Sequence, residues 1–133
     1  MNSPYRIETL AAAPAIHTYF DVVPESPDGR RVVYFQFDGE PLTKGRVMVR
    51  PRDGGPAIEI KHCSGNAHDG ARQGWFDNDK VFFTADSHVY IATDHGEILQ
   101  QFPGAINTFC PVTRRGIAAS VNWRGAGRPL KES

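Results

Sequence analysis

The sequence is poor in cysteine, has no excess charge of either sign and contains no long hydrophobic run. Its two cysteines, Cys63 and Cys110, lie far apart, and no stretch approaches the ~20 apolar residues of a membrane span. Residues 1–15 lack the apolar core of a signal peptide. We therefore expect a cytoplasmic protein whose two thiols are both free and reduced.

Lysine plus arginine equals aspartate plus glutamate at 15 each, so the formal net charge is zero. This balance argues against nucleic acid or a membrane surface as a mainly electrostatic partner. Ser26 and Ser120 lack the context of a hydrolase nucleophile, and residues 125–127 (Gly-Ala-Gly) follow no strand-to-helix junction that would bind phosphate. The sequence therefore disfavours the serine hydrolases and the phosphate-loop enzymes.

Turn-forming residues are abundant, with 13 glycines and 10 prolines among 133 residues. Hydrophobic residues make up 40% of the chain and aromatic residues 11%, which is enough for the core of one domain. Many turn formers combined with this apolar content indicate many short strands rather than long helices. The composition therefore predicts an all-β fold.

The clearest local signal is the Ser-Pro-Asp-Gly turn of residues 26–29. Pro27 restricts φ at the first corner, Asp28 can accept a hydrogen bond from the backbone that follows, and Gly29 tolerates positive φ. A pair of arginines then leads into the β-branched and aromatic residues 32–35. This segment predicts a tight turn that enters a strand.

The same order of strands and turns recurs along the chain. The expected strands are residues 16–23, 32–37, 46–50 and 57–61, then 73–76, 80–84, 88–92 and 98–102, then 107–110 and 117–121. Four antiparallel strands joined by turns and repeated at this spacing are typical of propeller blades. We therefore predict a partial β-propeller of about two and a half four-stranded blades, with a β-sandwich as the alternative.

The predicted organisation is an N-terminal arm at 1–15, blades at 16–61 and 71–102, a partial blade at 107–122 and a flexible tail at 123–133. A propeller needs at least about four blades, or roughly 160 residues, to close its ring. We therefore expect either the first part of a longer protein or an open array. The free sheet edge would be covered by further blades or by self-association.

The turn at residues 26–29, with the strand that follows it, resembles the blade signature of the TolB-like and WD40-like propeller repeats. Residues 51–56 (Pro-Arg-Asp-Gly-Gly-Pro) are similar to the link between the third and fourth strands of those repeats. The resemblance extends over residues 16–122 and implies a propeller fold. It implies little about activity, because propellers have many functions.

A narrower resemblance connects the chain to the propeller-type oligogalacturonate lyases. Residues 17–20 (His-Thr-Tyr-Phe) before a Pro-Asp-Gly turn, and the histidine-containing loop of residues 68–75, are similar to that family. The resemblance implies β-elimination on oligogalacturonides with a divalent metal. The metal-binding and catalytic histidines of the family lie mainly in later blades, so we expect no cofactor in this chain and transfer no catalytic residue to it.

Ligands of propellers usually bind where loops join one blade to the next, here residues 15–18, 62–72 and 103–107. The candidate ligand-binding residues of this region are His17, His68, Asp69, Arg72 and Gln73. Arginine can bind a carboxylate through two hydrogen bonds, and histidine can act as acid, base or metal ligand near neutral pH. The alternative interpretation is an ordinary polar surface loop. The histidines and the cysteine of this region match no structural zinc spacing, so we predict no metal site.

Two functions remain open from the sequence. One is that of a carbohydrate-active enzyme, whose N-terminal blades use His17, His68 and Arg72 to bind an anionic oligosaccharide. The other is that of a non-catalytic propeller module that binds a protein or peptide.

We expect His17 to be partly buried in an aromatic strand. Packing between blades, rather than stacking on sugar, is predicted for Trp75, Phe82, Phe83 and Tyr90.

Overall fold

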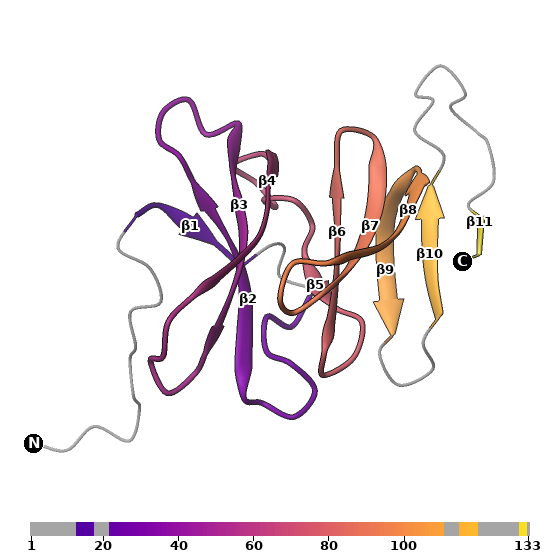
Figure 1. The fold of residues 1–133 in the computed structure, drawn as a ribbon. Helices are drawn as coiled ribbons and strands as arrows, with labels where there is room; N and C mark the ends of the chain where they lie inside the picture. The colour runs from indigo at the N-terminus through magenta and orange to yellow at the C-terminus, as the bar shows by residue number, and fades with distance from the viewer. Residues whose placement is uncertain (1–12, 18–21, 111–114, 120–130, 133) are drawn as a thin grey trace, which may run out of the picture.

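The computed structural model describes residues 13–17, 22–110, 115–119 and 131–132. The regular elements of these segments are all β-strands, so the predicted all-β class is confirmed. No helix long and apolar enough to cross a membrane occurs among the described residues. Figure 1 shows the strands grouped into three sheets that follow one another in chain order.

The first two sheets each consist of four consecutive antiparallel strands. The first sheet contains β1 (Ala15–Ile16), β2 (Arg31–Phe37), β3 (Lys44–Pro51) and β4 (Ile58–Ser64). The second contains β5 (Gly74–Trp75), β6 (Lys80–Ala85), β7 (His88–Thr93) and β8 (Ile98–Pro103). Each strand pairs with the next one along the chain, which is the strand order of a propeller blade.

The third sheet has the order β11-β10-β9. Its strands are β9 (Ala105–Cys110), β10 (Arg115–Ala119) and β11 (Lys131–Glu132). Strand β10 begins at Arg115, two residues before the expected strand at 117–121, and Lys131 of the expected flexible tail pairs with Ala118. Residues 1–12, 18–21, 111–114, 120–130 and 133 lie outside the described part of the chain.

The second sheet is packed on both faces, because successive side chains of a strand point to opposite sides. On one side, Val81 and Phe83 of β6 join Val33 and Phe35 of β2 in a shared buried cluster. On the other side, Phe82 packs in a second cluster with Val89 and with Ile106 of β9. Each such side chain contributes roughly 1.5–3 kcal/mol to folding. The four aromatic residues predicted to pack between blades are all buried.

Two predicted loops are shorter than expected because strand pairing continues into them. The pairing of β3 with β4 extends to Lys44 and Ser64, so His62 and Cys63 lie in a strand rather than in a loop. Pro103 ends β8 and Ala105 begins β9, so the expected loop at 103–107 is reduced to one glycine. Of the first expected strand, residues 16–23, Ile16 lies in β1, whereas Ala15, a residue of the expected arm, pairs with Gln36; residues 18–21 of that segment lie outside the described residues.

The Ser-Pro-Asp-Gly turn forms as predicted and also connects the first two sheets. The Asp28 carboxylate accepts hydrogen bonds from the Ser26 hydroxyl at 2.6 Å and from the Arg30 backbone N–H at 3.1 Å. Gly29 has a φ of 72°, which favours glycine. The backbone N–H of Asp28 donates to the Asn78 side chain at 2.8 Å, so the turn is bound to the loop between β5 and β6.

Candidate functional site

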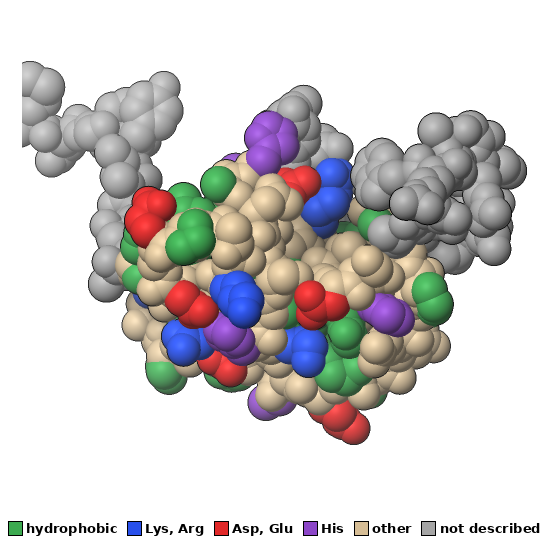
Figure 2. Space-filling model, turned by 90° about the horizontal axis from the view of Figure 1, so that it is seen from above, with side chains coloured by type: hydrophobic (Ala, Val, Ile, Leu, Met, Phe, Trp, Pro, Cys, Tyr) green, Lys and Arg blue, Asp and Glu red, His purple; other side chains and the backbone are tan. Residues whose placement is uncertain are grey.

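Four of the predicted ligand-binding residues, His68, Asp69, Arg72 and Gln73, belong to the segment of residues 65–73, which connects strands at the upper end of the sheets in Figure 1, as do residues 38–43 and 86–87. Figure 2 views the molecule from above and shows basic, acidic and histidine side chains interspersed over this face. No large area of one charge sign is visible there. The face therefore fits a ligand that is recognised by a few specific groups better than a long polyanion.

The loop between β4 and β5 is held together by Asn66. Its side-chain oxygen accepts hydrogen bonds from the backbone N–H groups of His68 at 2.9 Å and of Asp69 at 3.0 Å. Its side-chain nitrogen donates to the Asp69 carboxylate at 2.6 Å, and Arg72 forms an ion pair with the other oxygen of that carboxylate at 3.2 Å. Asp69 is buried, so it stabilises the loop and fixes the Arg72 side chain.

Gln73 is fully buried and joins this loop to the first strand. Its side-chain oxygen accepts a hydrogen bond from the Ala71 N–H at 3.0 Å, and its side-chain nitrogen donates to the Ile16 carbonyl at 3.1 Å. Gly70 has a φ of 61°, and a Cβ there would lie 2.8 Å from Cβ of Phe35. Gln73 therefore contributes to the packing of the loop and exposes no surface to a ligand.

The Gln73–Ile16 bond brings together two segments that are 57 residues apart. His17 follows Ile16 directly and is exposed, although its aromatic surroundings in the sequence predict partial burial. Strand β1 ends at Ile16, so no ladder of hydrogen bonds carries His17 into the sheet. His68 is exposed on the adjoining loop. This part of the upper end therefore presents two imidazoles and a fixed guanidinium, which are groups that can bind an anion.

Local sequence spacing did not reveal two further polar pairs at the same end. His62 Nε2 lies 2.7 Å from the Asp38 carboxylate, and the Ser64 hydroxyl donates to the Asp86 carboxylate at 2.9 Å. Both pairs join residues more than 20 positions apart: strand pairing within the first sheet brings His62 near Asp38, and the contact between the first two sheets brings Ser64 near Asp86. Within the described segments, no group of three or more His, Cys, Asp or Glu residues is arranged to hold a metal ion.

Cys63 lies between these pairs in sequence but faces the core, where it is buried and free of any disulfide. Burial raises the pKa of its thiol to about 12, and the nearby Asp86 carboxylate adds to this shift. A thiolate is the nucleophilic form of cysteine, and it is scarcely populated at neutral pH when the pKa is this high. Cys63 therefore acts as a small core residue.

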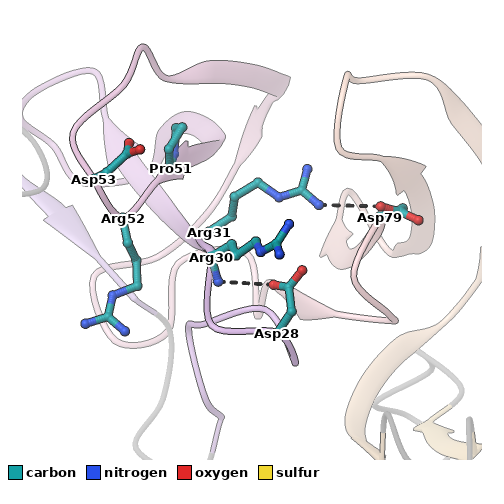
Figure 3. A pocket seen from close by; sticks show the side chains of 7 residues that line it. All are labelled: Asp28, Arg30, Arg31, Pro51, Arg52, Asp53 and Asp79. Carbon is teal, nitrogen blue, oxygen red and sulfur yellow. Dashed lines mark hydrogen bonds and ion pairs between the residues drawn. The ribbon is translucent and has the colours of Figure 1, made fainter.

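The opposite, lower end contains a pocket of about 560 Å³ (Figure 3), which the loop residues of the upper end do not reach. Its lining residues are Asp28, Arg30, Arg31, Pro51, Arg52, Asp53 and Asp79. Arg31 forms an ion pair with the buried Asp94 and lies 3.5 Å from the Asp79 carboxylate. Its guanidinium also stacks over the Trp75 ring at 5.4 Å. Arg31 thus joins the first sheet to the second.

No family model, curated protein or solved structure matches this chain.

Proposed function

We propose that this chain is the N-terminal part of a TolB-like β-propeller protein that binds an anionic carbohydrate at the upper end of its blades. The observation that supports this proposal is the Gln73–Ile16 hydrogen bond, which holds the residue before His17 against the loop that carries His68 and Arg72. The resemblance to oligogalacturonate lyases supplies the ligand class, which is a short oligogalacturonate.

The chemistry of these side chains fits a uronic acid. A guanidinium matches a carboxylate in shape and charge, and imidazoles can donate to sugar oxygens or to a second carboxylate. The Asp69 ion pair fixes Arg72, which lowers the entropy cost of ordering the site on binding. In this proposal, β-elimination and any divalent metal belong to later blades of the parent protein, and the present residues bind the substrate.

The proposal is tested by titrating the 133-residue chain with short oligogalacturonates and, as neutral controls, with malto-oligosaccharides of equal length. We expect saturable binding of the acidic series alone. A His17→Gln/His68→Gln double variant should bind about tenfold more weakly, since a hydrogen bond to a charged group contributes roughly 1.5–3 kcal/mol. A His88→Gln/His95→Gln double variant serves as the matched control and should bind normally.

Absence of saturable binding by a correctly folded chain, or equal affinity of both double variants, would refute the carbohydrate proposal. Catalysis is tested separately. The chain extended by its natural downstream sequence should release unsaturated products from oligogalacturonates, which absorb in the ultraviolet. Binding without product formation would retain the carbohydrate ligand and remove the lyase activity.

A non-catalytic module that binds a protein or peptide is the second candidate. The observation that favours it is that Asp69 and Gln73, two of the five candidate residues, are buried and hydrogen-bonded within their own loop. In such a loop these two side chains stabilise the conformation of the surface and do not take part in chemistry. Retention of the same partner by wild-type chain and by the His17→Gln/His68→Gln variant would show that this partner does not use the upper end.

A further inference from the structure

The lower pocket, defined by the seven lining residues named above, has the size of a small-molecule site. Its volume of about 560 Å³ lies within the roughly 300–1,000 Å³ that such sites occupy. Strand β2 begins in the pocket at Arg31 and runs toward the upper end, where Phe35 pairs with Ile16. The pocket is therefore separate from the proposed carbohydrate site and has no role in the function proposed above.

The aspartates of the first sheet in the lower pocket are already used by their own turns. Asp28 accepts hydrogen bonds from the Ser26 hydroxyl and from the Arg30 backbone, and these bonds lower the pKa of its carboxyl group. Asp53 accepts a hydrogen bond from the backbone N–H of Gly55 at 3.2 Å. These carboxylates therefore shape the loops that form the pocket walls.

Arg30 is the cation of the pocket whose side chain forms no hydrogen bond or ion pair with a described residue, although its charge helps to lower the pKa of the nearby Asp28 carboxyl group. Arg31 pairs with Asp94, and Arg52 lies 3.4 Å from a Glu25 oxygen, whereas the exposed Arg30 guanidinium has no hydrogen bond or ion pair with any described residue. In Figure 3 the Arg30 side chain extends beside that of Arg31, and Arg52 points away from both.

The backbone that carries Arg30 is held on both sides. Its N–H donates to the Asp28 carboxylate, and its carbonyl accepts a hydrogen bond from the Arg52 N–H at 2.9 Å. The guanidinium thus projects from a fixed point beside the pocket. On the opposite wall, the Asp79 carboxylate is 78% exposed and lies at a long 3.5 Å from Arg31, which leaves it able to accept further hydrogen bonds.

We propose that the lower pocket binds a small polar ligand with an acidic group, either carboxylate or phosphate, and several hydroxyl groups. Arg30 pairs with the acidic group, because a guanidinium forms strong charge-assisted bonds with both kinds of anion. Asp79 accepts hydrogen bonds from the hydroxyl groups. The lining has three aspartates beside its three arginines, and Arg30 is the cation available for pairing, so the pocket matches a small molecule with a single acidic group.

The test is an NMR titration of the isotope-labelled 133-residue chain with three probes that share a sugar ring. Glucose 6-phosphate carries a phosphate, glucuronate carries a carboxylate, and glucose carries neither. We expect at least one acid to shift the backbone amide signals of Arg30, Arg31 and Arg52 in a saturable manner, and glucose to leave them unchanged. The acid that binds more tightly identifies the anion.

Arg30→Gln should weaken that binding by at least about tenfold, since it removes a charge-assisted pair. Arg46→Gln is the matched control, because Arg46 is an exposed arginine that pairs with Glu59 outside the pocket. The proposal would be overturned if glucose also saturated the amide shifts, or if Arg30→Gln bound the acid as tightly as wild type. It would also be overturned if the amide signals of exposed arginines outside the pocket shifted to the same extent. His17→Gln/His68→Gln should bind normally here, so failure of the carbohydrate proposal and failure of this one are distinguishable.

Discussion

Replacing Arg31 by methionine should weaken the junction between the first and second sheets. Arg31 pairs with Asp94, which is only 7% exposed, and stacks on Trp75. Removing one member of a buried pair costs roughly 3–5 kcal/mol because the other charge stays desolvated. The Arg31 side chain is 24% exposed and Asp94 keeps a contact with His95 at 2.6 Å. These features reduce the expected cost to about 2–4 kcal/mol.

The measurement is urea unfolding of four chains: wild type, Arg31→Met, Asp94→Asn and the double variant. The double variant removes both charges, so it should lose less stability than the two single variants together, with a coupling of about 1–3 kcal/mol. Arg46→Met is the control, because its pair with Glu59 is about half exposed on both sides and should contribute under about 1 kcal/mol.

A loss for Arg31→Met no larger than that for Arg46→Met would refute this account of the sheet junction. Additive effects of the two single variants would also contradict it, because they would show that the two side chains do not stabilise each other. A change in the slope of the urea transition would point instead to an altered denatured state.

Three further predictions concern the buried groups of the first sheet and its loop. Gln73→Leu should destabilise the fold by about 2 kcal/mol, because it leaves the buried Ala71 N–H without its partner and removes the hydrogen bond from the loop to the Ile16 carbonyl; thermal unfolding measures this, and a loss near zero would contradict the structural role of the amide. Cys63 should react with a disulfide reagent only as fast as the protein unfolds, and a rate independent of urea would contradict its burial. Since the pKa of Cys63 rises from 9.0 to about 12 on folding, its contribution to stability should be complete below pH 9 and fall as pH rises toward 12. Cys63→Ala should remove this alkaline loss in urea unfolding at a series of pH values.

The positions of the strands were largely predictable because their signals are local. Alternation of polar and apolar residues marks the centre of β3, and the chemistry of the turn at residues 26–29 marks the start of β2. The ends of strands depend on a partner. Ser64 belongs to β4 because Lys44 is opposite it, and no local pattern near Ser64 contains that information.

The candidate site was predictable in composition but not in the roles of its residues. A polar loop rich in histidine, aspartate and arginine is visible in the sequence at residues 62–73. In the structure Gln73 is buried, whereas His17 and His68 are exposed. This difference depends on the contact of the loop with β1. The Arg31–Asp94 pair was missed for the same reason, since its members belong to different sheets.

The sequence by itself determined the all-β class, the repeated order of strands and the turn that begins at Ser26, because turn propensity and side-chain alternation act over a few residues. Only the tertiary structure decided which polar side chains are buried, which are paired across sheets and which face a pocket. These outcomes depend on contacts between segments far apart in the chain. Gln73 is buried and must therefore form hydrogen bonds within the protein, whereas Arg30 lines a pocket and stays exposed to solvent.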